Sequence, residues 1–131
     1  MRGRSPPKEV MQPEAEATRS YDQMVMIEKY ERVIGYLYPI AQSMPRKHGV
    51  MRDMFLSCLL GIPKEIYRAG KSNQVSKIYE VDAMLAELRF WMRRLIENKC
   101  MTTRQLQAAQ ALVSEVGAMV GAWVKRKRQQ G

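Results

Sequence analysis

Apolar residues recur every three or four positions in four successive segments of this 131-residue chain, and this period constrains the fold more than any other feature. Such a spacing places the apolar side chains on one face of an α-helix. We therefore expect helices over about 20–43, 47–69, 73–98 and 102–124. No segment alternates apolar and polar residues as a half-buried strand does. The sequence predicts an all-α protein.

The apolar row of each segment is a candidate for the core. The first row is Met24, Ile27, Tyr30, Ile34, Leu37 and Ala41, and the second is Val50, Met54, Phe55, Cys58, Leu59, Ile62 and Ile66. The third, interrupted by one acid, is Val75, Ile78, Asp82, Leu85, Leu88, Met92 and Leu95. The fourth is Leu106, Ala109, Val113, Val116, Val120 and Trp123. We expect the four rows to meet in one core.

Local signals mark the bends and ends of these helices. Pro39 is expected to kink the first helix before Pro45 ends it, and Pro63 should bend the second helix because it removes a backbone donor. Gly70 is a candidate C-cap for the second helix. Ser72 is a candidate N-cap for the third.

The connections between the segments are only a few residues long, so consecutive helices must fold back on one another. Thr102 and Gln105 have the spacing of a capping box at the start of the fourth helix. We predict an up-down-up-down antiparallel four-helix bundle that comprises residues 18–124 as one domain.

Two segments flank the predicted bundle. Residues 1–17 contain three prolines among charged and small residues, a composition typical of a flexible tail. Residues 125–131 are expected to form a basic C-terminal tail. No stretch has the length and apolar character of a signal peptide or a membrane span. We therefore expect a cytoplasmic protein that does not insert into a membrane.

The charge balance favours an anionic partner, because 22 Lys and Arg residues face 13 acids and the formal net charge is +9. Nucleic acid is the first candidate and an anionic membrane the second; solvated surface charge without a polyanion is the alternative. Two cysteines and one histidine are too few for a disulfide framework or a four-ligand zinc site. With no phosphate-binding glycine loop and no catalytic constellation, we expect neither cofactor nor metal nor enzymatic activity.

The strongest candidate basic patch lies on the third helix. Arg89 and Arg93 are four residues apart and share a face, with Arg94 beside them. Arginine binds phosphate through two parallel hydrogen bonds and stacks on bases. The alternative is that Asp82 and Glu97 neutralise this row.

Aromatic and small residues near this patch each allow two interpretations. Tyr79, Phe90 and Trp91 could stack on bases, although rings in such a helix are more typical of a core. Gly117 and Gly121 allow another helix to approach the fourth helix closely. We favour packing within the bundle over an oligomer contact for these glycines.

Three further groups of cations are candidate contacts to nucleic acid. Arg46, Lys47 and Arg52 lie at the start of the second helix; Lys71 and Lys77 lie around the next turn, close to Lys64 and Arg68; and Lys125, Arg126, Lys127 and Arg128 form a run at the C-terminus.

Several stretches resemble the accessory variability determinant (Avd) proteins of diversity-generating retroelements. These stretches are residues 21–24, 30–34, 36–43, 45–50, 58–61, 69–77, 88–91 and 115–117. The likeness extends over about residues 11–124. Such proteins belong to a wider four-helix-bundle family that includes the ribosomal RNA intervening-sequence proteins.

The resemblance implies a homopentameric barrel with a positive surface that binds a reverse transcriptase together with RNA and DNA. Such a protein supports mutagenic reverse transcription of a template RNA and has no chemistry of its own. Arg89 and Arg93 lie in the matching segment and one turn beyond it, so the resemblance supports them as contacts. A protein-only adaptor for the polymerase and a generic RNA-associated four-helix bundle are the alternatives.

Overall fold

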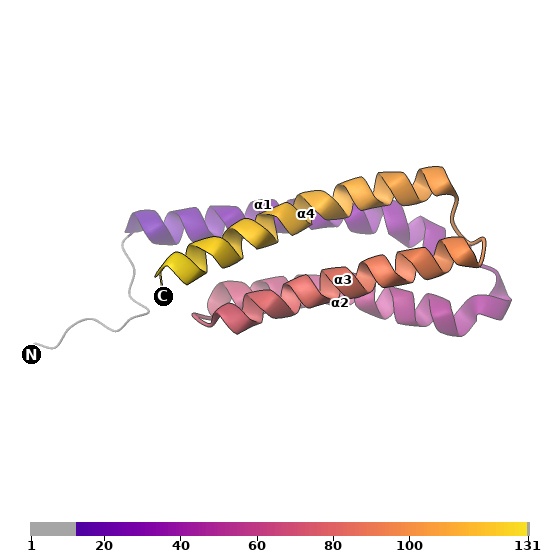
Figure 1. The fold of residues 1–131 in the computed structure, drawn as a ribbon, viewed down its shortest axis with the longest axis horizontal. Coiled ribbons are helices and arrows are strands. Elements are labelled where there is room, and N and C mark those ends of the chain that lie inside the picture. The colour runs from indigo at the N-terminus through magenta and orange to yellow at the C-terminus, as the bar shows by residue number, and fades with distance from the viewer. Residues whose placement is uncertain (1–12, 131) are drawn as a thin grey trace, which may run out of the picture.

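The computed structural model describes residues 13–130, with side chains from 22 to 129. Four long helices, α1 (Pro13–Gln42), α2 (Gly49–Lys71), α3 (Val75–Glu97) and α4 (Thr103–Gln130), run in alternating directions (Figure 1). A single short 3-10 turn, η1 (Arg46–His48), precedes α2. The prediction of an all-α, up-down-up-down bundle is confirmed for this part of the chain.

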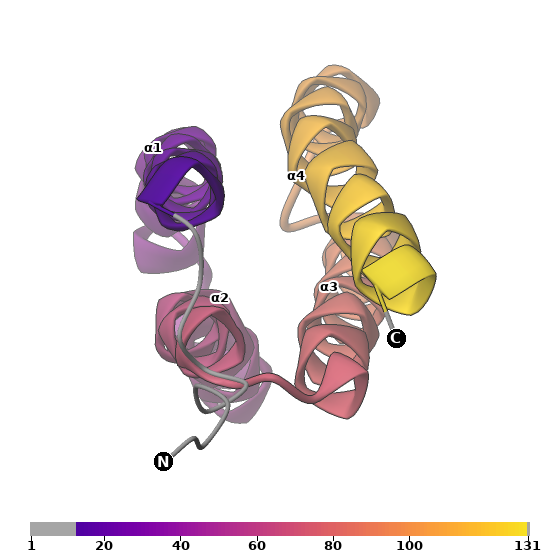
Figure 2. The same ribbon diagram turned by 90° about the vertical axis from the view of Figure 1, so that its left-hand side faces the viewer.

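The four helices form a ring in which each packs against two neighbours. α1 contacts α2 and α4, and α3 contacts α2 and α4. Viewed end-on, the helices occupy the corners of a square, with α1 diagonally opposite α3 (Figure 2). The pentameric assembly expected from the resemblance stays a prediction.

Both flanking segments differ from the sequence prediction. α1 begins at Pro13 rather than near residue 20, so the last five residues of the expected N-terminal tail are helical. Proline is tolerated there because the first turn of a helix leaves its N–H groups without intrahelical partners. Residues 1–12 lie outside the described part. α4 continues to Gln130, so residues 125–130 of the expected basic C-terminal tail are helical.

The core is formed by apolar and aromatic side chains from all four helices, and no charged side chain of the described residues is buried. The expected rows are wrong at five positions. Met24, Val50 and Met54 are exposed, and Val75 is half-buried and lies outside the core. The fifth position is on α3. Asp82 is exposed, and Val81 takes the buried position beside Ile78 and Leu85. An unpaired carboxylate would be costly to bury, whereas valine gains from burial.

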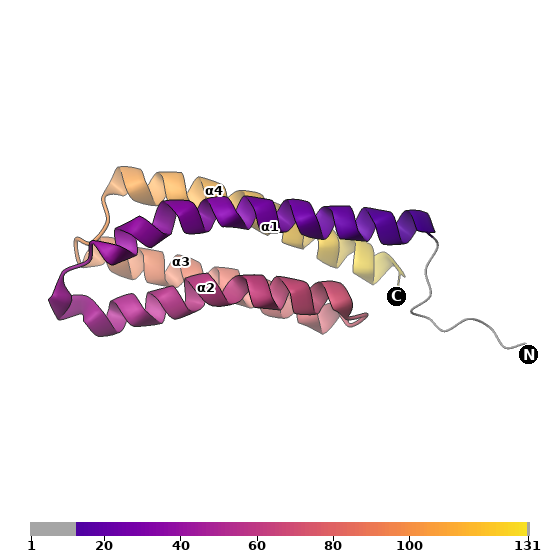
Figure 3. The same ribbon diagram turned by 180° about the vertical axis from the view of Figure 1, so that it is seen from behind.

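Pro63 creates the main irregularity of the core. Because proline has no N–H, the carbonyl of Leu59 four residues earlier loses its helical donor. The Tyr30 hydroxyl of α1 donates to that carbonyl at 2.6 Å. Burial raises the pKa of Tyr30, so the phenol stays protonated and able to donate. Both helices with an internal proline, α1 and α2, bend along their length (Figure 3).

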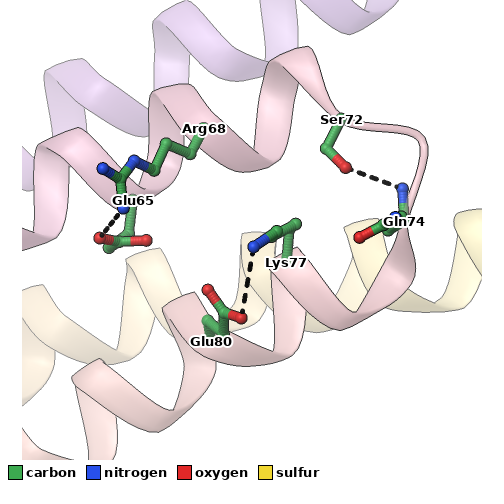
Figure 4. A network of polar contacts seen from close by, with 6 residues as sticks. All are labelled: Glu65, Arg68, Ser72, Gln74, Lys77 and Glu80. Atoms are coloured by element: carbon green, nitrogen blue, oxygen red, sulfur yellow. Dashed lines mark hydrogen bonds and ion pairs between the residues drawn. The ribbon is translucent and has the colours of Figure 1, made fainter.

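The turn between α2 and α3 differs from the expected caps. Gly70 lies buried inside the last turn of α2, where the Gln23 side chain of α1 fills the place that a Cβ would take. The helix ends one residue later, so Gly70 is not its C-cap. Gln74 occupies the N-cap position of α3, and the Ser72 hydroxyl accepts a hydrogen bond from the Gln74 N–H at 3.0 Å (Figure 4).

The turn between α3 and α4 follows known capping rules. Lys99 has a φ of 61°, the Cys100 N–H bonds to the Leu95 carbonyl at 2.8 Å, and the Lys99 N–H bonds to Ile96 at 3.1 Å. This is a Schellman motif with lysine where glycine is usual.

The capping box at the start of α4 is confirmed. The Gln105 N–H donates to the Thr102 hydroxyl at 3.0 Å, and the Thr102 N–H donates to the Gln105 side chain at 2.9 Å.

Candidate nucleic-acid interface

The antiparallel topology distributes the candidate cations over three regions rather than one. The α1–α2 and α3–α4 turns lie at one end of the bundle, where the Asn98 side-chain nitrogen approaches Met51 Sδ to 3.8 Å. The α2–α3 turn and the C-terminus of α4 lie at the opposite end (Figure 1). The third region is the outer side of α3.

The α3 region holds Arg89, which is half-buried, and Arg93 and Arg94, which are exposed. None of the three forms an ion pair with a carboxylate of the described residues. Asp82 and Glu97, which were considered as neutralising partners, are exposed and bind none of these arginines. The guanidinium groups are therefore available to an external anion.

Arg89 lies in the seam between α3 and α4. A Cβ built at Gly117 would stand 2.9 Å from Arg89 Nη2, so the glycine leaves room for this guanidinium. At Gly121 an added Cβ would meet no atom within 4 Å, and the residue is exposed. Packing within the bundle therefore explains Gly117 but not Gly121.

Two of the three aromatic residues of α3 differ from the expectation that they belong to the core, whereas Trp91 packs against it. Phe90 is 45% exposed and Tyr79 is 44% exposed. Trp91 is half-buried, and its indole N–H donates to Glu87 Oε2 at 3.1 Å. The rings of Phe90 and Trp91 meet edge to face, with centroids 5.0 Å apart. Two exposed rings thus lie on the same helix as the unpaired arginines.

The end that carries the α1–α2 turn is also positive. Arg46 and Lys47 are exposed and pair with no described carboxylate, whereas Arg52 Nε lies 3.2 Å from Asp53 Oδ1. Burial raises the pKa of the Cys100 thiol, and the charge of Lys47 partly offsets this.

The fold adds two cations to this end that the sequence reasoning missed. Lys99 lies in the α3–α4 turn, Arg104 lies in the first turn of α4, and both are exposed. They are distant in sequence from Arg46 and Lys47, and only the antiparallel pairing of the helices signals that they share one end of the bundle.

Ion pairs reduce the free charge at the opposite end. Lys77 Nζ lies 3.7 Å from Glu80 Oε2, and Arg68 Nη1 lies 3.3 Å from Glu65 Oε2 (Figure 4). Arg126 Nη2 lies 2.7 Å from Asp22 Oδ2.

The remaining cations of this end differ in exposure. Lys127 is half-buried on α4. Lys71, Lys125 and Arg128 are exposed and pair with no described carboxylate.

Eight of the twelve candidate residues thus keep exposed or half-exposed charge without an ion-pair partner among the described residues. They are Arg46, Lys47, Lys71, Arg89, Arg93, Arg94, Lys125 and Arg128.

No group of three His, Cys, Asp or Glu side chains among the described residues could hold a metal ion. None of the described helices is both long and apolar enough to cross a membrane.

These features define an all-helical bundle protein with a basic outer surface. The sequence matches a protein family described as bAvd-like over residues 24–127, a span that includes parts of all four helices. The chain belongs to this bAvd-like family, which confirms the family resemblance inferred from sequence. Membership implies an accessory protein of the Avd type. None of the curated proteins compared with the chain matches it.

Proposed function

We propose that this bAvd-like protein is a non-catalytic accessory factor of a diversity-generating retroelement. It binds the reverse transcriptase and nucleic acid, either template RNA or cDNA, and supports mutagenic reverse transcription. Family membership supports the accessory role. The observation that carries the nucleic-acid part is the set of three α3 arginines without carboxylate partners, Arg89, Arg93 and Arg94.

The mechanism is electrostatic. Each guanidinium that contacts a phosphate releases condensed counterions, and this release drives binding without regard to base sequence. A rigid helix holds Arg89 and Arg93 one turn apart, so two phosphates can be bound at once without ordering of the backbone. In a pentamer this row would be repeated five times around a ring. Template and product strands would then be held beside the polymerase.

A protein-only adaptor is the second candidate, and exposed apolar side chains on α1 and α2 favour it. Met24, Leu60 and Tyr67 are each about half exposed. Exposed apolar surface commonly marks a site of protein contact. In this alternative the bundle docks on the polymerase, and its positive charge matches an acidic protein surface.

The two functions are separated by a double substitution, Arg89→Ala with Arg93→Ala. The proposed function expects a large loss of affinity for RNA and DNA while association with the polymerase persists. If the protein is only an adaptor, the double substitution should weaken association with the polymerase and leave the affinity for RNA and DNA unchanged. The matched control is Arg32→Ala with Arg68→Ala, which removes two exposed arginines outside the candidate set.

Salt dependence gives an independent test of the same proposal. If an assembly neutralises about six to ten phosphates, raising the salt from about 50 to 200 mM should weaken duplex binding by roughly three to five orders of magnitude. An affinity that does not change with salt would contradict the electrostatic mechanism.

A further inference from the structure

Phe90 is an exposed ring on the outer side of α3. The ring is 45% exposed, although burying a phenylalanine side chain is strongly favourable. Its only aromatic contact among the described residues is the edge-to-face contact with Trp91. Trp91 is itself fixed by the hydrogen bond to Glu87 and by packing against the core. Phe90 is therefore an apolar surface held on a rigid helix.

The surroundings of Phe90 are positively charged. Arg93 and Arg94 follow three and four positions later, which places them one turn along the same side of the helix. Both are exposed and pair with no described carboxylate, and the half-buried Arg89 precedes Phe90 directly. Glu87, the acid one turn before, is engaged by the Trp91 indole.

We propose that Phe90 is a stacking platform for an unpaired base, and that Arg93 and Arg94 bind the phosphates of the same strand. This inference rests on the proposed function and narrows it, because it names single-stranded nucleic acid as the ligand of the α3 surface. An aromatic ring beside cations is the usual arrangement for sequence-tolerant binding of single strands. In a duplex the bases are stacked on one another and cannot reach such a ring without unstacking.

The geometry of the helix suits this arrangement. With a rise of about 1.5 Å per residue, Arg93 and Arg94 lie roughly 4.5 and 6 Å along the axis from Phe90. A long arginine side chain at that distance can reach a phosphate next to a base stacked on the ring. Covering the ring with a base would also remove apolar surface from water.

Tyr79 provides a matched control on the same helix. It lies eleven residues before Phe90, which is the same face, and it is 44% exposed. Its neighbours are acidic: Asp82 is exposed, and Glu80 already pairs with Lys77, the nearest cation in the sequence. Tyr79 thus has the exposure of Phe90 without the free cations.

The test measures binding of three probes by fluorescence anisotropy: a short oligothymidylate, an abasic strand of the same length, and a duplex. Phe90→Leu should weaken oligothymidylate binding roughly 5- to 150-fold, the range for loss of one stacked base, and leave abasic binding unchanged. Phe90→Tyr should retain wild-type affinity because it keeps a ring. Tyr79→Leu should bind all three probes as the wild type does.

Several outcomes would overturn the inference. If Phe90→Leu weakens binding of the abasic strand as much as binding of oligothymidylate, the ring does not stack on bases. The same conclusion follows if the substitution weakens binding of none of the three probes. If Phe90→Leu loses only polymerase association, the ring is a protein contact. In each of these cases the proposed nucleic-acid function survives, provided that Arg89→Ala with Arg93→Ala still abolishes binding. If the wild type binds none of the three probes, the proposed function fails as well.

Discussion

The hydrogen bond from Tyr30 to the Leu59 carbonyl allows a sharp test of how α1 and α2 are joined. Tyr30→Phe removes one oxygen atom and keeps the ring, so the packing volume changes little. In the wild type Pro63 cannot donate to the Leu59 carbonyl, and the tyrosine hydroxyl is its donor at 2.6 Å. After the substitution this carbonyl is left without that donor among fully buried side chains.

The expected cost follows from the asymmetry of buried hydrogen bonds. Losing a typical bond costs about 1 kcal/mol, but leaving a buried acceptor unsatisfied costs about 1–3 kcal/mol. We expect Tyr30→Phe to lower the free energy of unfolding by about 2 kcal/mol. In a Pro63→Ala background the N–H of the new alanine can donate to the Leu59 carbonyl. There Tyr30→Phe should cost less than about 1 kcal/mol.

The assay is urea denaturation of four proteins, the wild type, the two single variants and the double variant, followed by far-UV circular dichroism. The four free energies form a double-mutant cycle whose coupling term should be about 1–2 kcal/mol. Equal costs of Tyr30→Phe in both backgrounds would refute the reasoning, because the hydroxyl would then not be replacing the donor that Pro63 lacks.

Three further predictions concern local features. Lys99→Gly should raise the free energy of unfolding by about 1 kcal/mol, because a φ of 61° strains a residue with a Cβ; a lower thermal midpoint would contradict this. Thr102→Ala should lower that free energy by about 1 kcal/mol through loss of the capping box, while Thr103→Ala, outside the box, should not. Cys58→Ala should flatten the alkaline loss of stability. Burial and Glu87 raise the pKa of the thiol from 9.0 to about 12, so the folded wild type keeps a proton that the unfolded chain releases. Its stability should fall between pH 9 and 12 by at most about 1.4 kcal/mol per pH unit, and equal slopes in wild type and variant would refute this.

Apolar periodicity was sufficient to predict the four helices and most of their buried faces. It failed where two neighbouring positions competed for the core, as at Val81 and Asp82, since the stripe of a helix drifts and either position fitted the expected row. The cost of burying an unpaired acid decides such a case, and the valine is buried.

Cap signals were less reliable than periodicity because one residue type serves several purposes. Gly70 predicted a helix end, yet it lies inside α2, where the Gln23 side chain of α1 fills the space that a Cβ on this glycine would take. A contact between residues 47 positions apart leaves no local signal. The capping box of α4 was predictable because both partners lie within three residues of each other.

The candidate contacts to nucleic acid were chosen from charge and spacing, and neither reveals which cations are paired. Arg52, Lys77 and Arg126 form ion pairs, and the partner of Arg126 is Asp22, at the other end of the sequence. The exposure of Phe90 was not predictable either. An apolar residue next to a buried row fits the helical period equally well whether its side chain is buried or exposed.

The stability of the fold and the proposed binding of nucleic acid depend on different parts of the molecule. They should therefore respond differently to salt concentration. Interhelix ion pairs such as Lys29–Glu115, at 3.0 Å, are exposed, and pairs of this kind contribute little to stability. The apolar core holds the bundle together, so its unfolding should depend only weakly on salt. The α3 arginines have no carboxylate partner within the described chain to compete with a phosphate, so binding of a polyanion should weaken steeply as salt rises. If instead stability and binding declined together, the cations would be needed to hold the helices in place, and the surface proposed for nucleic acid would be a structural element of the bundle.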